Sequence, residues 1–207
     1  MAKVNINNGV GPSLSNSSAD IKTTIDALEY RGYTYRDAIY EGRLSSGVID
    51  GVFEIHDEVL DFSFAGLVNF QESTPVFDFE VSAKKIDFCQ LNLTDFPCQV
   101  AFTSDINLSG KDLKSMDGDV VVDNILLIQD TTELAIKHIE INSQVSDEHN
   151  TFHLASDFVD FDIQGRFNLI KFIPETFNQI VANVSGHNDV WKIDYNPVTL
   201  DLSLIHI

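Results

Sequence analysis

The chain has 207 residues, with 13 Lys and Arg against 32 Asp and Glu, so its formal net charge at pH 7 is −19. A polyanion repels phosphate backbones, which argues against nucleic-acid binding and against anionic membrane surfaces as partners. The hydrophobic content of 43%, with 15 Phe, argues against a disordered chain. No apolar run is long enough for a membrane-spanning helix.

The first 20 residues are rich in Asn, Ser and Gly without hydrophobic periodicity, so residues 1–20 are predicted to be a flexible lead-in. They lack the apolar stretch of a secretory signal peptide, and we expect any export signal or anchor to lie outside this chain. A helix over Ala19–Tyr30 is disfavoured because Thr23, Thr24 and Ile25 are β-branched.

A period of two dominates the rest of the chain. Phe62, Phe64 and Val68 share one face of an extended segment while polar residues share the other, which is typical of a half-buried strand. Turn residues such as Ser46-Gly47 and Asp50-Gly51 separate such runs. The same alternation recurs over residues 76–82, 105–109, 120–128, 134–141, 151–154, 160–169 and 198–202. The chain is therefore predicted to be mainly β.

One later segment favours a helix. Pro174 and Glu175 suit a first helical turn, and apolar residues follow at helical spacing as far as Val184. This pattern predicts one short helix near residues 174–184.

A strand unit is repeated. Asp61–Phe70 and Asp160–Leu169 align residue for residue, and Asp105–Gly110 is a degenerate third copy. Repetition of this kind predicts an elongated, quasi-one-dimensional sheet, with a bend or bulge at the shared glycine. We take residues 21–201 as one repetitive β segment with units of roughly 21–101 and 102–201.

The last six residues, 202–207, match the translation of CTG TCT CTT ATA CAC ATC, a transposon end used to build sequencing libraries. Residues 202–207 are therefore expected to be adapter sequence and are set aside in fold reasoning. The alternative is that they end a genuine strand.

No motif points to catalysis or to a metal. Asp157, Asp160 and Asp162 alternate with apolar residues, as on the acidic outer face of a strand, and lack the glycine of a calcium loop. The histidines are scattered, and His149 and His153 are expected on the solvated side of a hairpin. Because nucleophile and phosphate-binding motifs are missing, we expect no catalytic residues, no metal site, no cofactor and no enzyme activity.

The two cysteines, Cys89 and Cys98, flank a Phe-Pro turn at a spacing that fits no zinc pattern. Two unpaired thiols are the favoured interpretation because free Cys is often simply buried. The alternative is a disulfide between the two cysteines, which could form in an oxidising compartment.

The alternation leaves a long apolar face opposed by an acidic, polar one. The face is either the core between two packed sheets, as in a β-sandwich, or a trough that receives acyl chains. Phe suits both arrangements equally.

The segment GYTYRDAIYEGRLSSGVIDGVFEIHD, which ends at Asp57, resembles the long repetitive β-proteins of the TamB/AsmA superfamily, in particular TamB-type proteins of the Bacteroidetes kind. The segments LDFSFAGLVNF and DFDIQGRFNL extend the resemblance, which covers roughly residues 20–200. The family has no catalytic residues to carry over.

The resemblance implies an elongated antiparallel curved sheet, a β-taco-like trough with an apolar inner surface. It implies a periplasmic protein of a Gram-negative bacterium, anchored in the inner membrane by a segment not present here. Phospholipid acyl chains would be its cargo and an outer-membrane barrel a partner, in lipid transport or in outer-membrane protein assembly and secretion. The alternation pattern assigns the lipid groove to Phe62, Phe64, Val68, Phe70, Phe77, Phe79, Val81, Ile106, Leu108, Phe161, Ile163, Phe167 and Leu169.

The alternative function is a secreted β-sandwich adhesin or carbohydrate-binding module. It predicts exposed aromatic side chains on a flat face, for which the candidates are Tyr30, Tyr33, Tyr35, Tyr40 and Trp191.

Overall fold

The structure is a computed structural model, and it describes residues 2–11, 13–111, 116–146, 150–165 and 198–203. Its strands are β1 (Ala2–Val10), β2 (Ser18–Tyr30), β3 (Tyr33–Ser45), β4 (Val48–His56), β5 (Leu60–Asn69), β6 (Val76–Asp87), β7 (Cys98–Ser109), β8 (Asp117–Gln129), β9 (Thr132–Val145), β10 (Asn150–Ser156), β11 (Asp160–Gly165) and β12 (Val198–Ser203). One short 3-10 turn, η1 (Leu14–Asn16), lies between β1 and β2.

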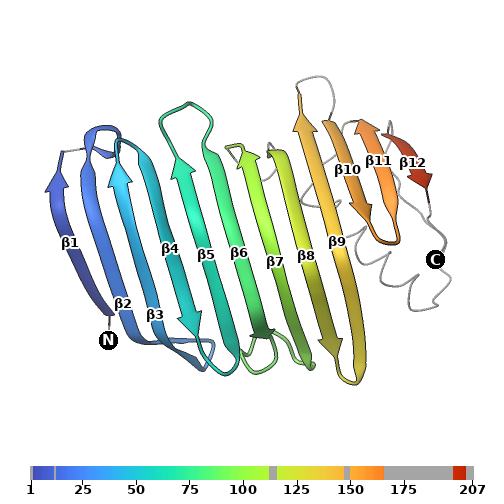
Figure 1. Cartoon of the computed structure of the whole chain (residues 1–207), viewed down its shortest axis with the longest axis horizontal. Helices are drawn as coiled ribbons and strands as arrows, with labels where there is room; N and C mark the ends of the chain where they lie inside the picture. Colours follow the sequence, from blue (N-terminus) through green and yellow to red (C-terminus); the bar gives the residue numbers. More distant parts are fainter. Residues whose placement is uncertain (1, 12, 112–115, 147–149, 166–197, 204–207) are drawn as a thin grey trace.

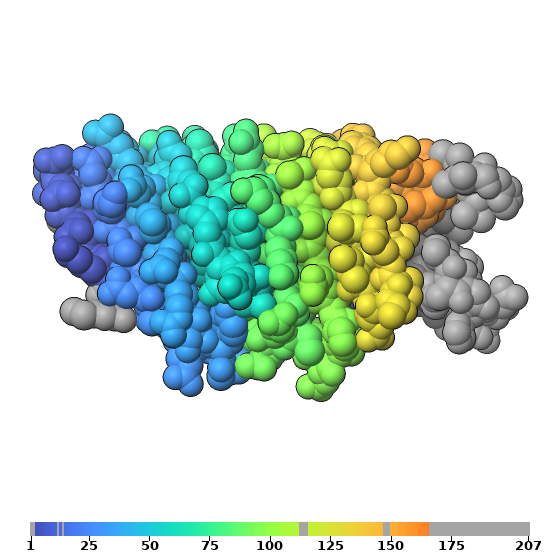
Figure 2. Space-filling view, turned by 60° about the horizontal axis from the view of Figure 1, so that its bottom comes forward, coloured from blue at the N-terminus to red at the C-terminus, as the bar shows by residue number. Residues whose placement is uncertain are grey.

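All twelve strands form one antiparallel sheet in which spatial order equals sequence order (Figure 1). Each strand therefore pairs with its neighbours along the chain, and within the described residues no second sheet covers either face. The sheet is open and curved, with β1 and β12 at opposite ends. In the space-filling view the strands follow one another as bands along the long axis of the molecule (Figure 2). The expected mainly β, elongated sheet is confirmed.

Local chemistry explains why the chain turns where it does. Ser46 and Gly47 have φ angles of 49° and 87°, which suits a tight turn between β3 and β4. The turn expected at Asp50-Gly51 is wrong, because both residues lie inside β4. A side chain on Gly51 would meet the Tyr40 hydroxyl at 2.7 Å, so this glycine makes room for the tyrosine rather than for a turn.

The segment predicted as a flexible lead-in contains a strand. Residues 2–10 form β1, which pairs with β2 from Ala2 opposite Ile25 to Val10 opposite Ser18. The low strand propensity of the Asn-rich segment is outweighed by the backbone hydrogen bonds that the edge of β2 offers. The segment Ala19–Tyr30, for which a helix was disfavoured, is part of strand β2.

The two repeat copies adopt the same backbone conformation at their shared glycine. Asp61 and Asp160 stand at or next to the start of β5 and β11, and Gly66 and Gly165 both have a φ angle of 149°. At the end of the sheet, Leu202 and Ser203 lie in β12. The expected helix near 174–184 and residues 204–207 lie outside the described residues.

Candidate functional site

One face of the sheet is mostly apolar, and we call it the apolar face. In an antiparallel ladder, directly opposed residues place their side chains on the same face. The strand register links two such rows from β4 to β11. One row is Gly51, Gly66, Phe79, Ile106, Val120, Ile141, Leu154 and Phe161; the next is Ile49, Val68, Phe77, Leu108, Gly118, Ser143, Phe152 and Ile163. The apolar face therefore crosses eight neighbouring strands without a change of side.

The register brings most of the predicted groove residues onto this face. They are Phe62, Phe64, Val68, Phe77, Phe79, Val81, Ile106, Leu108, Phe161 and Ile163. Phe70 instead follows the end of β5, where it is exposed and its backbone N–H donates to the Gly47 carbonyl. Phe167 and Leu169 lie outside the described residues.

The phenyl rings of the central strands contact one another. Phe64 stacks on Phe53 at a centroid distance of 5.8 Å and meets Phe79 edge-on at 5.6 Å. The Phe side chains of β5 and β6 remain only half-buried, because no second layer packs on them among the described residues. These rings form the accessible part of the apolar face.

The far end of the apolar face differs from the expected groove. Phe161 and Ile163 are only 2% and 1% exposed, and they form a small core with Phe152 and Val159. At the β10–β11 end, the predicted groove residues Phe161 and Ile163 are therefore buried in a core and do not line an open trough. The reason is packing: Ile141, Leu154 and Phe158 close around this cluster.

The opposite face, which we call the polar face, carries the acidic residues. Three histidines there stand directly opposite an aspartate on the next strand: His56 opposite Asp61, His138 opposite Asp123 and His153 opposite Asp162. The Nδ1 to carboxylate distances are 2.7, 2.7 and 2.9 Å. Sequence reasoning missed these pairs, although His and Asp placed symmetrically about a hairpin turn are a usable signal.

The hydrogen bond between His138 and Asp123 raises the pKa of that imidazole, burial opposes the rise, and the charges of Asp123, Glu140 and Asp157 add to it. Asn142 on β9 likewise donates to Asp119 at 2.6 Å. Cross-strand polar pairs thus tie neighbouring strands together on the polar face.

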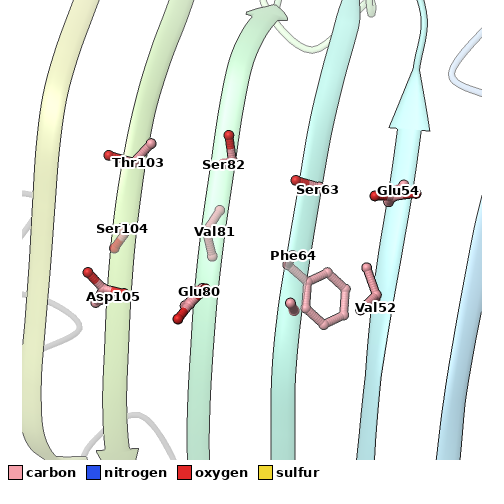
Figure 3. Close-up of a pocket in the computed structure, with 11 residues that line it drawn as sticks. Val52, Glu54, Ser63, Phe64, Glu80, Val81, Ser82, Thr103, Ser104 and Asp105 are labelled. Carbon is pink, nitrogen blue, oxygen red and sulfur yellow. The ribbon is translucent and has the colours of Figure 1, made fainter.

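A shallow hollow of about 350 Å³ lies on the polar face over β4 to β7 (Figure 3). Two register rows supply most of its lining: Glu54, Ser63, Ser82 and Thr103 in one, and Val52, Ala65, Glu80 and Asp105 in the other. The row between them, Phe64, Val81 and Ser104, also contributes to the lining, although strand alternation places its side chains on the apolar face. Small side chains on β5 and β6 leave the space, and the carboxylates make its wall acidic. Eight of its eleven lining residues belong to the polar-face rows, so the hollow is distinct from the predicted groove although Phe64 and Val81 are common to both.

The tyrosine cluster does not form a flat platform. Tyr33 and Tyr35 lie 4.9 Å apart with their rings at 81°, so one ring meets the other edge-on. Burial raises the pKa of Tyr33 to about 12, and a hydrogen bond to Asp57 adds to the rise. Tyr30 is exposed and Tyr40 packs over glycines, while Trp191 lies outside the described residues. The flat aromatic face that the adhesin or carbohydrate-binding alternative requires is not formed by the described tyrosines.

The structure also places the cysteines and the remaining histidine candidate. Cys89 and Cys98 are both free and half-buried, and burial raises the pKa of the Cys98 thiol. Of the histidines expected on a hairpin, His153 is on the polar face and His149 lies outside the described residues. Among the described residues, no helix has the length and apolar character needed to cross a membrane.

The fold, an open single-layer antiparallel sheet, is the only basis for classifying the described part of this chain, because comparison with known proteins adds no family. No protein-family model matches the chain, and no curated protein and no solved structure is significantly similar to it.

Proposed function

We propose that this chain is a segment of a bridge-like envelope protein that carries phospholipid acyl chains along its apolar face. The protein would cross the periplasm, anchored in the inner membrane by a segment outside this chain. It would serve lipid transport to the outer membrane or the assembly and secretion of outer-membrane proteins. The observation that carries the proposal is that the apolar face is accessible over β4 to β8, because no second layer covers the sheet among the described residues.

The energetics suit such a cargo. Moving an acyl chain from water onto an apolar surface is favourable by roughly 0.8 kcal/mol per fully buried CH₂ group. The half-buried rings of Phe64, Phe77 and Phe79 offer that surface, and the rows of the register extend it across neighbouring strands. Headgroups would stay in water at the rim. The mechanism is passive, with no catalytic step for any residue.

The charge distribution supports the same assignment. The chain has a net charge of −19, and the carboxylates of Glu54, Glu80 and Asp105 are exposed on the polar face. A strongly charged face stays in water, so the two faces of one sheet would separate solvent from cargo. Exposed carboxylates along the sheet also oppose edge-to-edge association of chains.

The proposal is tested by lipid retention. The chain is exported to the periplasm of a Gram-negative host, purified without detergent, and its extracted phospholipid is measured by mass spectrometry. We expect Phe64→Asp and Phe79→Asp to lower the phospholipid per protein severalfold, because each places a charge among contacting rings.

Ser63→Asp is the matched control, since Ser63 is adjacent to Phe64 in sequence but lies on the polar face. It should retain the phospholipid of the original chain. Circular dichroism checks that all variants keep the sheet. If the original chain carries no phospholipid, or all three variants carry equal amounts, the proposal is wrong.

A further inference from the structure

Three side chains of types that ligate metals converge on the polar face of the β10–β11 hairpin. His153 is the register partner of Asp162, and Asp160 lies two residues before Asp162 on the same strand, hence on the same face. The Nδ1 atom of His153 lies 2.9 Å from an oxygen of Asp162 and 3.8 Å from one of Asp160. One donor atom from each residue falls within 4.8 Å of the other two.

The hairpin holds these side chains on a rigid backbone. Phe152 and Phe161, next in sequence to His153 and to both aspartates, are each 2% exposed in the small core beneath the hairpin. The turn is closed by hydrogen bonds between Ser156 and Val159, including Ser156 N–H to the Val159 carbonyl at 2.7 Å. Ligands on packed, paired strands are positioned before an ion arrives, which lowers the ordering cost of binding.

We propose that His153, Asp160 and Asp162 form a site for a divalent transition metal, of which Zn²⁺ is the best match. An imidazole nitrogen with two carboxylates suits zinc, whereas Ca²⁺ and Mg²⁺ prefer oxygen ligands alone. Small side-chain rotations bring the three donors to the ~2.0–2.2 Å that zinc requires. Because all three side chains are partly exposed, water completes the coordination.

The two other His–Asp pairs show why this one is different. His56 faces a single carboxylate, that of Asp61. His138 meets Asp123 through Nδ1 and Glu140 through Nε2 at 4.0 Å, so the two carboxylates lie at opposite nitrogens of the ring and cannot share one ion with it. Among the described residues, His153, Asp160 and Asp162 are the one group of three whose donors converge.

A bound ion would join β10 to β11. Any ligand that binds the folded state and not the unfolded one stabilises the fold by mass action, so zinc would raise the thermal midpoint of the chain, and more so as the free zinc concentration rises above its Kd. The ion would act as a clamp for the hairpin at this end of the sheet. This role is independent of the lipid proposal, because the site lies on the polar face.

The test is a calorimetric titration of the whole chain with Zn²⁺ at neutral pH, with CaCl₂ as the oxygen-preferring control. We expect one tight zinc per chain and no comparable heat from calcium. His153→Ala, Asp160→Asn and Asp162→Asn should each weaken zinc binding by about tenfold or more. Asp61→Asn is the matched control, because it alters a His–Asp pair with the same geometry, and it should bind zinc as the original chain does.

Thermal midpoints measured without zinc show whether each variant folds. Asp162 is the most exposed of the three residues, so Asp162→Asn is the variant expected to disturb the packing least. Zinc should raise the midpoint of the original chain and of Asp61→Asn, but not that of Asp162→Asn. The proposal is overturned if the original chain does not bind zinc. It is also overturned if Asp160→Asn and Asp162→Asn bind zinc as tightly as the original, or if Asp61→Asn loses binding equally.

Discussion

At the scale of single residues, the polar face is organised by cross-strand pairs between a histidine and an aspartate. In one such pair, the hydrogen bond to Asp123 is the chief cause that raises the pKa of His138 above the ordinary value of 6.5. Because the folded pKa is the higher one, the protonated ring stabilises the fold. That contribution is complete below about pH 6.5 and is lost as the pH rises through the folded pKa.

This predicts the effect of Asp123→Asn. The His138 pKa, followed by NMR titration of the ring protons, should fall toward 6.5. The decrease in unfolding free energy that accompanies deprotonation of His138 should become smaller. The pair is about half exposed, so we expect only about 0.2–1 kcal/mol, and less in high salt. An unchanged His138 titration in Asp123→Asn would contradict the assigned cause.

At the scale of elements, β5 and β11 are two copies of one sequence unit with the same glycine conformation. A side chain on Gly66 would lie 2.0 Å from the backbone oxygen of Asp78 on β6, and the φ angle of 149° is unfavourable for any other residue. The glycine therefore permits the close approach of β5 and β6 in the middle of the apolar face.

We expect Gly66→Ala to lower the unfolding free energy by about 1–3 kcal/mol from backbone strain alone, with the clash adding to it. Urea denaturation measures the change. Gly9→Ala in β1 is the control, since its added methyl would meet only Ile6, at 3.8 Å, and should change stability by no more than about 0.5 kcal/mol. Equal losses in the two variants would refute the role of Gly66.

The elements also show how far sequence reasoning reaches. Alternation located the strands that contain Phe62, Phe77 and Ile106, because period two is a direct consequence of the pleat. It failed for β1, where Asn and Gly hide an edge strand whose stability comes from pairing with β2 rather than from propensity. It also read Asp50-Gly51 as a turn, since local composition cannot reveal the Tyr40 ring that the glycine accommodates.

At the scale of the whole molecule, alternation fixes the side of each residue but not whether a face is covered by a second sheet. The sequential strand order decides that question for the described residues, and sequence alone could not supply it. The same holds for the candidate sites. Phe64 and Phe79 were predictable from their own strands, whereas the convergence of His153 with Asp160 and Asp162 depends on the register of a hairpin.

The central claim is that acyl chains lie on the apolar face, and site-specific photocrosslinking in the periplasm tests it most directly. A benzophenone amino acid replaces Phe64 or Phe79 on the apolar face, and Ser63 or Glu80 on the polar face of the same strands. After irradiation, mass spectrometry detects phospholipid joined to the chain. The account predicts adducts at Phe64 and Phe79 but not at Ser63 or Glu80. Equal adducts on both faces, or none on the apolar face, would contradict it.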